Sequence, residues 1–338
     1  LENLVKYAHK FSGDHNLDVT LLYNYNFAWN RGLEADANTF PSDVLSYYSL
    51  SLGENQSTAA SYTDYHAISM MARVNYSYKD RYLLTATGRR DGASVFSQNH
   101  KFGFFPSMGL GWILSEESFL HQVPFVNFLK VRFSWGANGN QAINRYQSLS
   151  TIEPKDNYDY LFDGNTAYGI AATAMGNPDL KWESTYATNY GVDFELFHSR
   201  VSGSINYYNS NTRNLLVQRN IPNLNGFSSV VSNLGAVNNR GLEIELTTIN
   251  VDNGSIKWQT GVNFARNKNK IVHLYGVRDA NGKEEDDISN QWFIGKSLGA
   301  YYNYKPTGIW QKGDEIPTGF RAGDVKLKDV NGDGAITA

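Results

Sequence analysis

The chain has 338 residues with 30 basic and 33 acidic side chains, and its formal net charge of −3 gives no dense basic face, so nucleic acid is not an expected partner. The absence of cysteine excludes a disulfide framework, a thiolate metal site and a cysteine nucleophile. A content of 22 Tyr and 18 Phe favours β-strands, and 36 Asn favour turns rather than helices.

Apolar and polar residues first alternate with period two in residues 17–29, where every odd position is apolar or aromatic. The same alternation returns in later segments, several of which are longer than the usual strand of a soluble protein. This pattern predicts about nine β-strands. Their expected ranges are 17–29, 65–78, 81–89, 102–114, 128–135, 182–196, 200–208, 241–250 and 255–267.

The connections between these strands alternate in length. Short ones are expected at residues 79–80, 197–199 and 251–254, and long ones at 30–64, 136–181 and 209–240. In an up-and-down meander, alternate connections lie at the same end, so one end of the sheet carries short turns and the other carries long loops. This asymmetry is typical of an outer-membrane barrel, which has short periplasmic turns and long extracellular loops.

We therefore expect an all-β fold: an antiparallel up-and-down transmembrane β-barrel with long extracellular loops. Because about nine strands do not close an even-numbered barrel, the chain is expected to be part of a larger one. Residues 1–270 would form strands and loops, and residues 271–338 an extracellular loop region. The alternative is a soluble or surface-exposed carbohydrate-binding β-domain, in which the odd face of residues 17–29 is buried in a core.

Enzyme chemistry finds no support in the sequence. The seven histidines are scattered, so no catalytic zinc site can be assembled from their spacing. The acidic run 284–287 suits a solvated loop better than two carboxylates that face one bond. We expect no catalytic residue, and we expect that the protein is not an enzyme.

Several distinct short motifs lie along the chain. They are Asp80-Arg81-Tyr82-Leu83-Leu84, Arg90-Asp91-Gly92-Ala93-Ser94, Phe105-Pro106-Ser107, Glu117-Ser118-Phe119-Leu120, Trp135-Gly136-Ala137-Asn138-Gly139-Asn140, Asn177-Pro178-Asp179-Leu180-Lys181-Trp182-Glu183, and Asn238-Asn239-Arg240-Gly241-Leu242-Glu243. In these motifs and their order, the chain resembles the SusC/RagA family of TonB-dependent outer-membrane transporters of Bacteroidota.

The resemblance implies a function and a set of partners. Members of this family import oligosaccharides or peptides across the outer membrane with energy relayed from the TonB complex. A SusD-like surface lipoprotein acts as the lid of the transporter, and a plug domain lies N-terminal to the barrel. The resemblance therefore predicts an outer-membrane location in contact with lipid, with the plug domain, the TonB box and the remaining strands outside this sequence.

A metal-binding hypothesis concerns the segment that contains Asp329, Asn331 and Asp333. Their spacing, followed by Gly334, is that of the oxygen ligands that open a calcium loop. Two interpretations stay open, a Ca²⁺ site and a surface turn rich in Asx residues. No other cofactor is expected.

The expected long loops contain aromatic residues that are candidates for substrate binding, because aromatic rings stack on sugar rings and contact apolar side chains of peptides. The same rings would also pack loops against one another, and both interpretations stay open. The candidates are Tyr158, Tyr160, Tyr168, Phe227 and Trp310.

Overall fold

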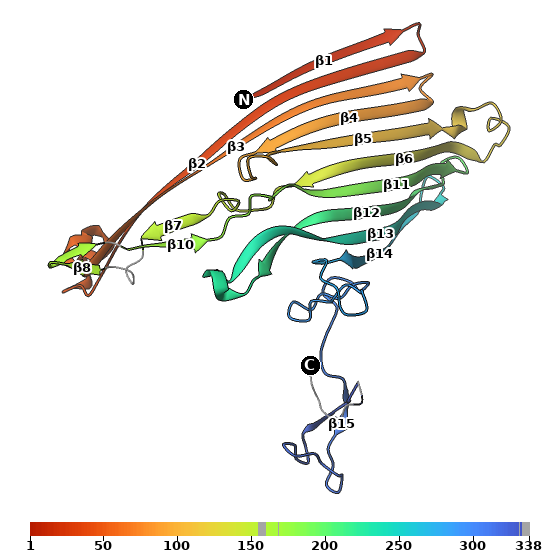
Figure 1. The fold of residues 1–338 in the computed structure, drawn as a ribbon. Coiled ribbons are helices and arrows are strands. Elements are labelled where there is room, and N and C mark those ends of the chain that lie inside the picture. Colours follow the sequence, from red (N-terminus) through yellow and green to blue (C-terminus); the bar gives the residue numbers. More distant parts are fainter. Residues whose placement is uncertain (155–159, 168, 331, 333–338) are drawn as a thin grey trace.

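A computed structural model describes residues 1–154, 160–167, 169–330 and 332. Its largest element is one ten-stranded antiparallel sheet with the order β1-β2-β3-β4-β5-β6-β11-β12-β13-β14 (Figure 1). Each strand therefore lies beside its predecessor and its successor in this sheet. The structure confirms the predicted all-β, up-and-down fold, and the sheet is unclosed among the described strands, as in part of a barrel.

The bounds of the strands in the large sheet are as follows: β1 Glu2–Phe11, β2 His15–Asn38, β3 Glu54–Tyr78, β4 Tyr82–Ala93, β5 Phe102–Ile113, β6 Val126–Asn140, β11 Glu183–Leu196, β12 Val201–Asn220, β13 Ser229–Asp252 and β14 Lys257–His273. Three small two-stranded sheets lie outside it: β7 Thr151–Pro154 with β10 Ile170–Ala174, β8 Tyr160–Phe162 with β9 Asn165–Ala167, and β15 Pro306–Ile309 with β16 Val325–Leu327. The 3₁₀ segments are η1 Asp43–Leu52, η2 Leu114–Glu116 and η4 Asn223–Asn225. No helix in the described part of the chain has the length and hydropathy needed to cross a membrane.

The sheet has ten strands rather than about nine, because β1 was missed by the sequence analysis. Its ten residues include Val5, Tyr7 and Phe11 at odd positions, but Asn3 and His9 at odd positions and Leu4 at an even position interrupt the alternation. A tight connection, with positive φ at Ser12 and Gly13, joins β1 to β2. The expected count therefore failed on a strand whose apolar pattern is weak.

Two of the expected long loops are largely strand. β2 and β3 have 24 and 25 residues and pair almost to their ends, with Asn38 opposite Glu54 and η1 at the tip. β12 and β13 likewise extend to a tip near η4. Most residues in the β2–β3 extension are exposed on both faces, so the extension lacks the apolar alternation on which the prediction rested.

The register divides the sheet into an apolar face and a polar face. Because successive side chains of a strand point to opposite faces, residues that are opposite one another across the ladder share a face. One row of the apolar face, in order from β2 to β13, is Leu17, Tyr76, Leu84, Leu110, Phe133, Tyr190, Tyr207 and Leu242.

The polar face carries charged groups that pair with one another. Arg132 donates to Asp193 at 2.6 and 2.7 Å and to Asn206 at 3.0 Å, across three neighbouring strands. Arg89 forms a similar ion pair with Asp91 at 2.8 Å. Such a face is wrong for a dry core, since burying charged groups is costly even when they are paired.

The apolar face is exposed. On β2, Leu21, Phe27 and Trp29 have relative exposures of 49%, 46% and 56%, and no second sheet covers this face among the described residues. The alternative β-domain required this face to be buried in a core. Its exposure supports the barrel interpretation instead.

The ends of the sheet differ. Connections 12–14, 79–81, 114–125, 197–200 and 253–256 lie at one end, the short-turn end, where all but 114–125 have three or four residues. Residues 39–53, 94–101, 141–182, 221–228 and the chain after 273 lie at the other, the long-loop end. At the short-turn end, Glu117 accepts hydrogen bonds from the Tyr82 hydroxyl at 2.7 Å and from the Trp112 indole at 3.1 Å. These two rings are held at the margin of the apolar face.

A buried cluster lies at the long-loop end. Phe96 and Leu180 are 1% and 0% exposed, and the Trp182 ring packs on Phe96 while its indole N–H donates to the Lys101 carbonyl at 3.0 Å. Phe105 completes this cluster. Several motifs that gave the resemblance thus serve to pack two connections against the sheet.

A substitution at Gly203 tests the packing of this sheet. A Cβ at this position would overlap the backbone carbonyl oxygen of Glu245, whereas a Cβ at Gly261 would meet nothing within 4 Å. We expect Gly203→Ala in the full-length protein to cost about 1–3 kcal/mol of stability, because the backbone must shift. The midpoint of urea unfolding, followed by heat-modifiable mobility on gels, measures this loss. Gly261→Ala is the control, and an equal shift in both variants would contradict the packing assigned here.

Candidate functional site

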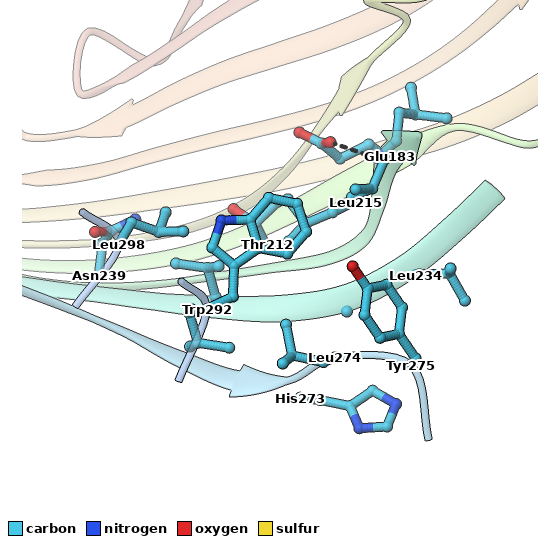
Figure 2. A pocket seen from close by; sticks show the side chains of 15 residues that line it. Glu183, Thr212, Leu215, Leu234, Asn239, His273, Leu274, Tyr275, Trp292 and Leu298 are labelled. Atoms are coloured by element: carbon cyan, nitrogen blue, oxygen red, sulfur yellow. Dashed lines mark hydrogen bonds between the residues drawn. The ribbon is translucent and has the colours of Figure 1, made fainter. Parts of the chain in front are cut away.

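A cavity of about 320 Å³ opens on the polar face at the long-loop end. Strands β12, β13 and β14 form its floor, and residues 274–298 form its wall. Figure 2 shows the rings of Tyr275 and Trp292 beside the strand residues. Other lining residues are Glu183, Thr212, Leu215 and Val237.

The β12–β13 hairpin has an irregular backbone at this position. Asn214 and Gly235 have φ values of 55° and 75°, and the ladder resumes on either side of them. The Asn233 amide donates to the carbonyls of Lys181 at 2.6 Å and Asn214 at 3.0 Å. These bonds tie the outer part of the hairpin to the preceding loop, and this part of the hairpin contributes Leu215 to the cavity.

The wall segment is attached to the end of β14 by Glu284. Its carboxylate accepts the backbone N–H groups of Leu274 at 2.9 Å and Gly276 at 2.7 Å, and the imidazole of His273 at 2.6 Å. Burial, the largest influence, acts to raise the pKa of Glu284, but these hydrogen bonds outweigh it and hold the pKa below its ordinary value of 4.5. The segment is therefore anchored through an ionised carboxylate.

A second carboxylate fixes the aromatic part of the wall. Asp287 accepts the Tyr275 hydroxyl at 2.7 Å and the Asn290 amide at 2.7 Å. Burial and then this bond to Asp287 raise the pKa of Tyr275, so its hydroxyl stays protonated and remains a donor. Asp286 accepts the N–H of Ile294 at 2.7 Å.

The acidic run 284–287 is thus not simply a solvated loop, because three of its four carboxylates accept hydrogen bonds within the segment. These bonds hold an apolar cluster over the strand ends. Its buried members are Val237, Ile271 and Leu274, and its partly buried members include Leu215, Tyr275, Trp292 and Ile294.

The lining determines the chemistry of the cavity. Its volume is at the lower end of the range for ligand pockets, about 300–1,000 Å³, and its aliphatic and aromatic lining suits a small apolar group or the apolar face of a sugar ring. The Glu183 carboxylate is already occupied by the Leu216 N–H at 3.1 Å and the Asn140 amide at 3.1 Å. Both oxygens of this carboxylate therefore already accept a hydrogen bond within the protein.

The predicted aromatic candidates do not converge on this cavity. Phe227 lines a second cavity of about 440 Å³ between residues 144–151, residues 173–175 and the tip of the β12–β13 hairpin. Tyr160, on β8, is 63% exposed. Trp310 lies in the β15–β16 hairpin, where the Lys326 ammonium is 4.3 Å from its ring.

Two further candidates, Tyr158 and Tyr168, lie outside the described residues. The role of all five aromatics in substrate binding therefore stays a prediction. The sequence analysis missed Tyr275 and Trp292, and its available signal was the acidic run between them.

The predicted calcium loop also stays a prediction. Asn331 and Asp333 lie outside the described residues, and the Asp329 carboxylate accepts the Gly332 N–H at 2.7 Å. Within the described part of the chain, no group of three or more acidic or histidine side chains has the geometry of a metal site.

Comparison with known proteins gives a consistent result. The profile of the family described as "TonB dependent receptor-like, beta-barrel" matches residues 3–337. TonB-dependent receptor P3 of Formosa agariphila is 34% identical over 99% of this chain and 34% of its own length. TonB-dependent receptor SusC of Bacteroides thetaiotaomicron is 34% identical over 63% of this chain and 21% of its own length.

A solved structure titled as the RagAB peptide importer in the "closed-closed" state has the same fold. It aligns with a TM-score of 0.81 and 23% identity, covering 97% of this chain and 36% of the neighbour. The chain spans about a third of the length of the first curated relatives that it matches.

Glu284→Gln tests the anchoring of the wall. The folded pKa of Glu284 is depressed, so its stabilising contribution is present above its unfolded pKa and is lost as pH falls through the folded value. We expect the variant to exchange amide hydrogens in residues 274–298 about tenfold faster at neutral pH, a loss of ~1.4 kcal/mol, since hydrogen bonds to a charged group are replaced by weaker ones.

As the pH falls, the exchange rate of these amides in the wild type should approach the rate in Glu284→Gln. Hydrogen exchange by mass spectrometry at several pH values measures both effects. The exposed neighbour Glu285 is the control: its backbone N–H donates to the Val277 carbonyl, and its carboxylate accepts no hydrogen bond from the residues that the structure describes. If Glu285→Gln accelerated exchange as much as Glu284→Gln, the anchor would be misassigned.

Proposed function

The chain belongs to the TonB-dependent receptor-like β-barrel family, and on this premise we propose that it forms part of the wall of an outer-membrane importer. This family is one of receptors rather than enzymes. The observation that carries the proposal is the division of one long sheet into an exposed apolar face and a polar, charged face. A spanning barrel needs both faces, one for lipid and one for its lumen.

In this proposal, the short-turn end lies in the periplasm and the long-loop end faces the cell exterior. Tyr82 and Trp112 then lie at the inner margin of the lipid, where aromatic rings are partly buried and their polar atoms reach water. Residues 1–270 form strands and loops of the barrel, and residues 271–338 form an extracellular region. The polar face borders the lumen.

The proposed cargo is an oligosaccharide or a peptide. The cavity beside Trp292 and Tyr275 supports this choice, because it lies on the lumen face at the exterior end and has an apolar, aromatic lining. A neighbour in the same fold is titled a peptide importer. An apolar side chain of a peptide and the apolar face of a sugar both match such a lining.

We further propose the partners of the complete protein. A SusD-like surface lipoprotein would cover the long-loop end, and the TonB complex would act through a plug domain encoded outside this sequence. Ca²⁺ at the loop of Asp329, Asn331 and Asp333 would order the extracellular region. The similarity to SusC and to the RagAB structures supports the lipoprotein partner.

Substitutions at two neighbouring residues of β2 test the membrane orientation. Val19 lies on the apolar face opposite Val74, and Thr20 lies on the polar face between Lys6 and Arg73. We expect Val19→Asp to reduce the abundance of folded protein in the outer membrane several-fold, because it places a charge in lipid. Thr20→Asp should be tolerated, since two cations flank it. Immunoblots of fractionated cells measure both, and equal losses would contradict the assignment of faces.

A substitution at Trp292 tests the cavity. We expect Trp292→Ala to lower the uptake efficiency of the cargo about tenfold, equivalent to ~1.4 kcal/mol, because the largest ring of the wall is lost. Uptake of a labelled oligosaccharide mixture and of a labelled peptide mixture, in cells with equal amounts of folded protein, provides the measurement. Tyr301→Ala is the control, since this ring is fully exposed and does not line the cavity. Unchanged uptake by Trp292→Ala would remove the cavity from the import route.

A further inference from the structure

Five basic residues form a patch on the apolar face at the long-loop end of the sheet. We call it the basic patch: Arg213 on β12, Arg240 on β13, and Arg266, Lys268 and Lys270 on β14. All five side chains are exposed. On this face, they follow the apolar residues of the three strands in the direction of the long-loop end.

The register places these residues on the apolar face. Leu242, a member of the apolar row, is opposite Arg266, and Arg240 is opposite Lys268 one step farther along. The intervening Gly241 is covered by Tyr208, because a Cβ at this glycine would lie 2.6 Å from that ring. Tyr208 belongs to the polar face, so Arg240 points to the other side.

The charges of the patch are unbalanced. No carboxylate lies within ion-pair distance of any of the five in the part of the chain that the structure describes. The polar neighbour Asn238 donates to Asn209 and Asn211 at 2.6 and 2.8 Å, so these amides bond one another. Like charges opposite one another, as in Arg240 and Lys268, are destabilising unless an anion lies between them.

The position along β14 matches the edge of a lipid layer. Trp258 and Phe264 are apolar residues on this face, and Arg266 lies roughly 20 Å from Trp258 toward the long-loop end at a rise of about 3.4 Å per residue and a tilt of about 45°. The apolar band of a barrel is about 25 Å tall. By the same spacing Lys268 and Lys270 lie roughly 24 and 29 Å from Trp258, so the basic patch spans the limit of the apolar band, where the headgroups of the outer leaflet begin.

Other parts of the sheet end differently on this face. β2 and β5 carry exposed aromatic rings toward the same end, among them Trp29 and Phe102, and the arginines beside them lie over these rings: Arg31 is 4.9 Å from the Trp29 ring and Arg90 is 4.5 Å from the Phe102 ring. An aromatic girdle needs only an interface, whereas a cluster of unpaired arginine and lysine needs negative charge. Among the described residues, the five exposed cations of the basic patch lack such rings and therefore favour an anionic partner on this face.

We propose that the basic patch binds the phosphate groups of lipid A, the phosphorylated glycolipid of the outer leaflet. The guanidinium groups of Arg240 and Arg266 match phosphate oxygens in a bidentate way, and Lys268 and Lys270 add point charges. The acyl chains would lie along the apolar rows toward the short-turn end. This inference rests on the proposed membrane function, which sets the patch in the outer leaflet.

Lipid binding by the full-length protein in detergent tests the proposal. The probes are bisphosphorylated lipid A and the same lipid after enzymatic removal of both phosphates, and the readout is the dissociation constant measured by microscale thermophoresis. We expect Arg240→Gln/Lys268→Gln to weaken binding of the phosphorylated lipid about tenfold, and we expect the wild type to bind the dephosphorylated lipid as weakly as this variant. Binding of the phosphorylated lipid should also fall as salt rises.

The matched control is Lys257→Gln/Lys312→Gln, which removes the same charge from exposed positions outside the patch. Heat-modifiable mobility verifies folding, and Arg266→Gln/Lys270→Gln replaces the first pair if that variant fails to fold. Equal affinity of the wild type for the two lipids, or equal weakening by the control pair, overturns the proposal.

The same preparation separates the two proposals. If the wild type fractionates with the outer membrane and imports its cargo but does not distinguish the lipids, the lipid site alone is refuted. If the wild type fractionates as a soluble protein, both the importer function and the lipid site are refuted.

Discussion

The antiparallel register is the constraint on which the rest of the structure depends. Ten strands pair in chain order, and a one-residue slip in any ladder would exchange the two faces of the strands beyond it. The apolar row through Leu110 and Phe133, the Arg132–Asp193 pair and the basic patch are all consequences of one alignment. The surroundings of a residue therefore depend on the face of the sheet on which it lies and on its position along the strand.

The cavity exists because this regularity is relaxed at one place. Near Asn214 and Gly235 the ladder is irregular, and beyond them the hairpin packs on the buried cluster on one side and on the wall segment on the other. Leu216 contacts the first cluster and Leu215 the second. A regular hairpin would present alternate residues to lipid and lumen, whereas this one joins two packed regions.

The sequence predicted the parts of the fold that have a simple period. Alternation in residues 17–29 identified the strand and its exposed face, and the alternating lengths of the connections identified the end that carries short turns. Apolar alternation failed for β1, where Asn3, Leu4 and His9 break it, and for the β2–β3 extension, where both faces meet water and selection for apolar residues is absent. The cavity-lining segment 274–298 was missed for another reason. Glu284 and Asp287 accept hydrogen bonds from the Leu274 backbone N–H and the Tyr275 hydroxyl, which no local sequence pattern reveals. The resemblance identified the motifs, but only the structure shows that Leu180 and Trp182 serve packing.

The β2–β3 extension has a thermodynamic consequence for any partner of the long-loop end. Pairing between β3 and β4 stops at Ala67, while β3 begins at Glu54, so the two-stranded ribbon projects roughly 40 Å at about 3.3 Å per residue (Figure 1). The Tyr146 hydroxyl bonds Asp64 at 2.7 Å and braces its base. A disordered loop of this length would lose conformational entropy when it docks, but the ribbon has already lost it during folding. Its tip, with Tyr47 and Tyr48 69% and 81% exposed, therefore meets a partner with little further ordering cost.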